Sequence, residues 1–167
     1  MAIENFDEKL KKYAELIVKV GLNVQEGQKV VVRAGHNTVA LVREITAAAY
    51  KAGSPLVTVV WSDEQLNKIR HQYAPRDSFD CAAKWMFEGI AQEIREGAAY
   101  LQVSGADPEL LKDMDPATVS TSRQVMSKNF NLHSLVLYKN APALITQVAD
   151  KITIQLAAGK TVRVRPK

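Results

Sequence analysis

Three histidines and one cysteine are the residues best suited to metal binding or nucleophilic catalysis in this sequence: His36, His71, His133 and Cys81. No two histidines form a His-Glu-x-x-His pair, and a single cysteine cannot build a zinc-binding cluster. A nucleophilic serine in Gly-x-Ser-x-Gly is also absent, because Val103-Ser104-Gly105 lacks the first glycine. Structural or surface roles are therefore favoured for the histidines and for the thiol. The sequence predicts no catalytic, cofactor-binding or metal-binding residue.

The basic residues gather towards the end of the chain. Residues 126–167 carry seven Lys or Arg against Asp150 alone, a net charge of +6. The remaining fifteen basic and seventeen acidic residues leave residues 1–125 at −2. Such an asymmetry is a reason to analyse the two parts separately, and it makes the tail the candidate site for RNA binding.

In the tail, apolar residues at every second position predict the direction in which two arginine side chains point. Val162 and Val164 turn inward in a predicted strand, so Arg163 and Arg165 should point outward together. Tyr138 is the one aromatic residue in the predicted tail strands, which leaves little surface for base stacking. A solvated, charged edge strand that avoids aggregation is therefore favoured over nucleic-acid binding. The candidate nucleic-acid-binding residues are Lys139, Lys160, Arg163 and Arg165.

The elements that would position these residues alternate between strand and helix over residues 1–125. Runs rich in β-branched residues predict buried parallel strands at 29–34, 56–61 and 98–104. Helical periodicity predicts helices at 10–22, 39–52, 62–73, 78–96, around 110 and at 116–125. The predicted fold class is α/β, with a doubly wound, mainly parallel sheet and flanking helices.

Finer features of this part are also predicted. Tyr13 and Ala14 should face the core from the first helix. Asn37 or Thr38 should cap the helix at 39–52. Because the loop holding Gly35 has one glycine and no nucleotide-binding fingerprint, a helix cap is favoured there over a phosphate site.

Residues 126–167 change to a period of two. Apolar residues alternate over three or four short segments separated by turn residues, which predicts antiparallel strands in a small β-barrel or meander. We therefore predict two domains, an α/β domain over 1–125 and a small basic β module over 126–167.

Composition sets the broad class. The chain has 167 residues, of which 47% are hydrophobic and 24% charged, as is usual for a globular protein. A lone cysteine argues mildly for a reducing compartment, and no apolar run approaches the ~18 residues of a membrane helix. The acidic start MAIENFDEKL is unlike a signal peptide. A cytoplasmic protein with no membrane partner is expected.

Several segments resemble one enzyme family in their amino-acid sequence and in their order along the chain. They are 12–34, Tyr50–Pro55, Trp61–Leu66, His71–Pro75 and Val103–Leu111. Over about residues 8–124 the chain resembles the N-terminal domain of the thermophilic-type metalloaminopeptidases, the aminopeptidase T and aminopeptidase S group. The resemblance implies a relation to cytoplasmic exopeptidases with two divalent metal ions. It places those ions in a C-terminal catalytic domain without counterpart here, so no family ligand can be assigned to this chain.

The tail carries a second, weaker resemblance. Segments 135–146 and 151–167 resemble the N-terminal small β-barrel of ribonuclease II-type exoribonucleases. We therefore expect a fusion of two incomplete domains, natural or constructed.

Three functions follow as hypotheses. The first is a non-catalytic, cavity-covering N-terminal domain of a metalloaminopeptidase-type protein, inactive alone and without cofactor, with a separate catalytic domain as a candidate partner. The second is a module that binds RNA or another polyanion through the basic tail. The third is an oligomerising scaffold in which a second copy covers exposed hydrophobic faces.

Overall fold

The computed structural model describes residues 5–105 and 107–129, and it gives the backbone alone of the strand segments 135–138, 141–148, 152–156 and 161–164. The chain divides into two compact units. The first comprises Met1–Ala74 and Ala98–Asp115, and the second comprises Pro75–Gly97 and Pro116–Lys167. Each unit is therefore assembled from two separate stretches of chain.

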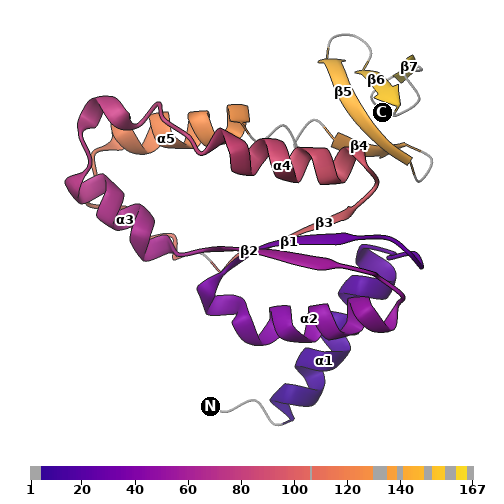
Figure 1. The fold of residues 1–167 in the computed structure, drawn as a ribbon. Helices are drawn as coiled ribbons and strands as arrows, with labels where there is room; N and C mark the ends of the chain where they lie inside the picture. The colour runs from indigo at the N-terminus through magenta and orange to yellow at the C-terminus, as the bar shows by residue number, and fades with distance from the viewer. Residues whose placement is uncertain are drawn as a thin grey trace. The chain divides into compact units, whose positions relative to one another are not determined.

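A three-stranded parallel sheet forms the centre of the first unit (Figure 1). Its strands are β1 (Val30–Gly35), β2 (Val57–Ser62) and β3 (Ala99–Val103), in the order β2-β1-β3. β1 pairs with both neighbours in parallel, which confirms the predicted parallel sheet. Since β2 and β3 lie on opposite sides of β1, the strand order reverses beside β1, as in doubly wound folds.

Helices α1 (Phe6–Leu16) and α2 (Val39–Lys51) cover one face of this sheet (Figure 1). Alternate residues of β1 point towards them, because successive side chains of a strand face opposite ways. Ile45 of α2 and Ala14 of α1 are completely buried. The core cluster contains Ala14, Val18, Val30, Val32, Ala34, Val42, Ile45, Ala48, Ala49 and Ala99.

The first helix differs from its prediction in two ways. α1 ends at Leu16 and continues as a π-helical turn over Ile17–Gly21, where the Leu22 amide donates to the Ile17 carbonyl at 2.7 Å. Tyr13, predicted to face the core, is 54% exposed. The prediction was wrong because the small side chains of Ala14 and Val18 already fill the contact with α2 and the sheet.

Thr38 occupies the N-cap position of α2, one of the two positions predicted, but without the expected side-chain cap. A 3-10 turn over His36–Thr38 leads into α2, and neither Asn37 nor Thr38 makes a capping hydrogen bond. Thr38 instead donates from Oγ1 to the Gly35 carbonyl at 2.7 Å. The amide of Asn37 is used elsewhere, at the end of the sheet.

Helix α3 (Glu64–Tyr73) follows β2 and begins as predicted. Asp63 caps it, accepting a hydrogen bond on Oδ1 from the Gln65 amide at 2.9 Å. The short helix predicted around Leu110 is a series of turns over 108–113.

The second unit contains a 3-10 turn (Arg76–Ser78), α4 (Lys84–Arg95) and α5 (Pro116–Asn129). α4 begins six residues later than predicted, because hydrogen bonds from Ser78 to Pro75 and from Cys81 to Ser78 hold the preceding segment in turns. The buried row of α4 is Phe87, Ile90 and Ile94.

Beyond α5 the described backbone forms an antiparallel meander, with the strands in sequence order. Its members are β4 (Leu135–Tyr138), β5 (Ala141–Val148), β6 (Ile152–Leu156) and β7 (Thr161–Val164). The predicted division at residues 125 and 126 falls inside α5. As a division between separate domains it stays a prediction.

Candidate functional site

The carboxyl-terminal edge of the parallel sheet gathers three loops in the first unit. β1 ends at Gly35, β2 at Ser62 and β3 at Val103, so the segments that follow them start side by side. In open α/β sheets, ligands bind at this edge and near the point where the strand order reverses. This edge is therefore the candidate functional site.

The side-chain amide of Asn37 joins the loops after β1 and β3. Its Nδ2 donates to the Gly105 carbonyl at 2.7 Å, across 68 positions of sequence. A Cβ at Gly105 would lie 2.9 Å from Nδ2, and a Cβ at Gly35 would lie 2.7 Å from Oδ1. Both glycines thus leave the space that the amide occupies.

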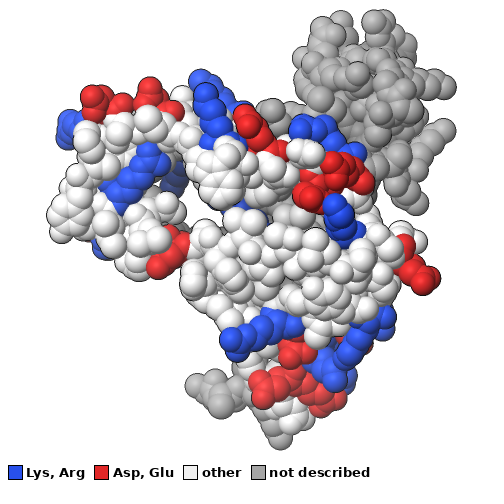
Figure 2. Space-filling model, viewed as in Figure 1, with Lys and Arg blue, Asp and Glu red and all other residues white. Residues whose placement is uncertain are grey.

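A carboxylate joins the loops after β2 and β3. Glu64 accepts a hydrogen bond on Oε2 from the Asp107 amide at 3.2 Å. Asp107 in turn accepts on Oδ1 from the Glu109 amide at 2.9 Å. Figure 2 shows acidic atoms at this end of the sheet, beside α3. Carboxylates that cap helices and turns in this way also give the edge a negative character.

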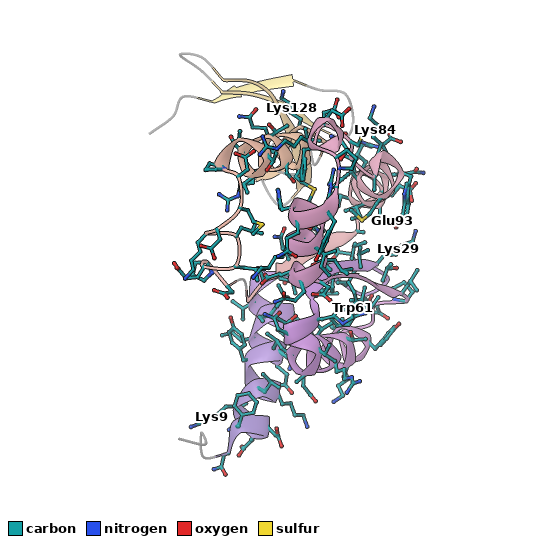
Figure 3. All side chains as sticks on the ribbon, turned by 90° about the vertical axis from the view of Figure 1, so that its left-hand side faces the viewer. Lys9, Lys29, Trp61, Lys84, Glu93 and Lys128 are labelled. Atoms are coloured by element: carbon teal, nitrogen blue, oxygen red, sulfur yellow. The ribbon has the colours of Figure 1, made fainter. Side chains whose placement is uncertain are left out.

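Two rings lie at the same edge. His36 and Trp61 have ring centroids 5.6 Å apart, with their planes inclined at 44°. Trp61 is 39% exposed, and Figure 3, which looks from the side where α3 lies, labels it. An exposed indole is suited to contact a ligand that carries a positive charge and an apolar group.

The face of the sheet that lies away from α1 and α2 carries more polar side chains. Burial raises the pKa of Tyr100 in β3 to about 12, while the charge of Arg33 in β1 and a hydrogen bond with it act in the other direction. The Tyr100 hydroxyl also lies 3.4 Å from Gln102 Oε1, to which it donates. The neutral phenol is therefore the stable form on this face.

The described residues do not fit the two-metal centre that the aminopeptidase resemblance implies. In the part of the chain that the structure describes, no three His, Cys, Asp or Glu side chains are grouped so that they could hold a metal ion. The acidic side chains at the sheet edge are spread over two loops and engaged by backbone amides.

The other candidates from the sequence are dispersed. His71 is half-buried in α3, and Cys81 is exposed in the turn before α4, where its Sγ donates to Asp80 Oδ1 at 3.5 Å. Both positions differ from their predictions of an exposed imidazole and a half-buried thiol on a helix. His133 lies outside the described residues.

Of the candidate nucleic-acid-binding residues, one falls on a described strand. Arg163 lies in β7 and is paired with Thr153 of β6. Lys139, Lys160 and Arg165 lie outside the described residues, and so do the side chains of β7. The predicted common direction of the two arginines stays a prediction.

Sequence reasoning missed the roles of Asn37 and Trp61. Each lies at or just after the end of a predicted parallel strand, and such ends meet at one edge of a sheet. That position was the available signal. The pairing of Asn37 with Gly105 had none, because it depends on the order of the strands.

Within the described ranges, none of the helices combines the length and apolar character that crossing a bilayer requires.

Comparisons with known proteins agree on one family. A family model described as thermophilic metalloprotease (M29) matches residues 6–140, past the predicted boundary at 125. Aminopeptidase T of Thermus thermophilus is 36% identical over 152 residues, which cover 91% of this chain and 35% of that protein. Aminopeptidase AmpS of Bacillus subtilis is 36% identical over 126 residues, covering 75% of this chain and 31% of that protein.

A solved structure gives the same result for the fold. Wild-type AmpT from Thermus thermophilus matches with a TM-score of 0.72 and 38% sequence identity, over 75% of this chain and 32% of that one. This chain thus spans about a third of the length of the curated relatives it matches.

Proposed function

The chain belongs to the thermophilic metalloprotease (M29) family, and from that membership we propose that it acts as a non-catalytic, cavity-covering domain of an aminopeptidase-type protein. One observation carries this proposal. The chain resembles aminopeptidases over about a third of their length, and the described part of that resemblance contains no cluster of side chains suited to a metal ion. The catalytic metal ions of such a protein would then be bound by residues outside the described ranges.

The sheet edge supports a role in contacting peptides. A peptide substrate of an aminopeptidase has a protonated amino terminus followed by a side chain. Trp61 offers an exposed apolar and π surface, and Glu64 and Asp107 place carboxylates on the adjoining loops. We expect this edge to prefer peptides with a free amino terminus, since the charge of that group is attracted by carboxylates and by an aromatic face.

Catalysis by the chain alone is tested by hydrolysis of leucyl-p-nitroanilide after incubation with zinc, manganese or cobalt. We expect no turnover above the blank and no stoichiometric bound metal, with aminopeptidase T of Thermus thermophilus as the positive control. Chelator-sensitive turnover together with stoichiometric metal would contradict the proposal.

Contact with peptides is tested by tryptophan fluorescence, because the described residues contain one tryptophan at the edge and another on α4. In the Trp85→Phe variant, Trp61 reports alone, and a free-amino dipeptide should change its emission while the N-acetylated dipeptide should not. The Trp61→Phe variant, in which Trp85 reports, is the matched control. Equal responses in the two variants, or to the two peptides, would contradict a role for the edge.

A second candidate function is binding of RNA by the tail. Its support is the charge of +6 over residues 126–167 and the position of Arg163 in β7 at the edge of the described meander. Phosphate contacts should give binding that weakens as salt rises. Titration of a labelled oligonucleotide at two salt concentrations tests it, with Arg163→Ala plus Arg165→Ala as the variant. Undiminished binding by that variant would reject the assignment of these arginines.

A further inference from the structure

His36 and Trp61 are brought together at the carboxyl-terminal edge of the sheet by the pairing of their strands. Ala34 of β1 is in register with Trp61 of β2, and His36 follows Ala34 by two positions. The two ring centroids are 5.6 Å apart, and the ring planes are inclined at 44°. Both side chains are exposed, so solvent protons reach the imidazole and a dissolved ligand reaches the indole.

The backbone on both sides of His36 is held by hydrogen bonds. The Gly35 carbonyl accepts a hydrogen bond from Thr38 Oγ1 at 2.7 Å, and Asn37 Nδ2 donates to the Gly105 carbonyl at 2.7 Å. The 3-10 turn over His36–Thr38 therefore presents the imidazole from a defined position. The contact between the two rings is thus part of the fold at this edge.

The distance between the rings suits an interaction that depends on charge. A cation within about 6 Å of the centre of an indole ring is attracted by the negative face of that ring. While the imidazole is neutral, the indole face remains available to a cationic ligand. The protonated imidazole is itself a cation 5.6 Å away, so it interacts with the indole and repels a second cation. The pair therefore has two states that differ in their affinity for a positively charged ligand.

We propose that protonated His36 competes with cationic ligands for the indole face of Trp61, so that this edge binds a peptide amino terminus more strongly at neutral than at acidic pH. The inference rests on the proposed contact of the edge with free amino termini. It adds a regulation of that contact by pH, in which His36 is the residue that binds the proton.

The elements next to this turn carry other groups that are charged or that titrate near neutral pH. They are Arg33 of β1, Arg43, Glu44 and Lys51 of α2, Asp63 after β2, Glu64, Lys68, Arg70 and His71 of α3, and Asp107 and Glu109 after β3. Carboxylate, ammonium and guanidinium groups ordinarily keep their charges between about pH 7.0 and 5.5, whereas imidazole gains a proton there. His71, the other imidazole among the described residues, is half-buried on α3 and provides the matched control.

The first measurement uses the full chain without a ligand, as the Trp85→Phe variant in which Trp61 is the remaining tryptophan. A protonated imidazole quenches the emission of an indole beside it. We therefore expect the emission to fall as the pH is lowered from about 7.0 to 5.5, and to stay level when His36→Gln is added. His71→Gln added to the same parent should retain the fall. An emission that does not depend on pH, or one that still falls with His36→Gln, would overturn the proposal.

The second measurement titrates leucylglycine into the same variants by calorimetry at pH 7.0 and 5.5, where its amino group is mainly protonated. The parent should bind about threefold more weakly at pH 5.5, since a cation–π contact is lost to His36 and a like charge is added. His36→Gln should bind equally at both pH values, and His71→Gln should behave as the parent does. Circular dichroism at each pH confirms that the fold is retained.

The outcomes distinguish the regulation from the proposed function on which it rests. Binding of equal strength by the parent at the two pH values would overturn the regulation and leave the contact with amino termini in place. Absence of binding at both pH values would overturn the proposed contact and the regulation together.

Discussion

The core of the first unit and the carboxyl-terminal edge of its sheet are built on the same three strands, but different interactions hold them. In the core, fully buried side chains such as Ile45 and Val32 are packed between helices and sheet. At the edge, exposed or half-buried polar groups are joined by single hydrogen bonds, such as those from Asn37 to Gly105 and from Asp107 to Glu64.

The difference indicates which region can change with little effect on folding. Burial of apolar surface contributes most of the favourable free energy of folding, whereas one hydrogen bond contributes about 1 kcal/mol net. The edge can therefore be altered without loss of the fold.

The largest effect is expected from a cavity in the core. Ile45→Ala removes a completely buried side chain of α2 and should lower the free energy of unfolding by about 2–5 kcal/mol. Leu66→Ala on α3, where the side chain is 63% exposed, is the control and should change it by less than about 0.5 kcal/mol. Urea unfolding followed by circular dichroism measures both, and equal effects would contradict the description of the core.

A smaller effect is expected at the edge. Asn37→Ala removes the bridge to Gly105 and should lower the free energy of unfolding by about 0.5–1.5 kcal/mol. Asn67→Ala, which removes an exposed amide of α3, is the matched control and should be nearly neutral. Hydrogen exchange should show the loss of protection confined to the loops after β1 and β3. A loss as large as that of Ile45→Ala would mean that the edge belongs to the core.

The smallest effect on stability at neutral pH is expected from substitution of Tyr100, on the polar face of the sheet. Burial raises the pKa of folded Tyr100 to about 12, so the native state retains a proton that the unfolded chain, with a tyrosine pKa near 10, releases. This contribution to stability is complete below pH 10 and is lost as the pH rises towards 12.

Comparison with Tyr100→Phe measures that loss. The variant has no phenol to ionise, so its stability should fall less steeply than that of the natural chain between pH 10 and 12, while the two curves run parallel below pH 10. Parallel curves above pH 10 would show that Tyr100 ionises equally in the folded and unfolded states.

Sequence reasoning identified the parallel strands and the family because these depend on local patterns. The β-branched run at 29–34 corresponds to β1, and the helix at 39–52 corresponds to α2. It misplaced α4, for which the sequence from Ser78 to Ala83 allows either helix or turns, and the turns are stabilised by their own hydrogen bonds. It also placed Tyr13 inside, since periodicity gives the side of a helix but not how much of that side the neighbouring elements cover.

The sequence by itself determined the α/β class, the concentration of positive charge in residues 126–167 and the M29 resemblance, because composition, period and residue order are properties of the chain alone. The tertiary structure decided that Asn37 reaches Gly105, that Glu64 reaches Asp107 and that His36 lies beside Trp61. Each of these depends on which strands are neighbours. Such contacts join residues far apart in sequence, and no local preference encodes them.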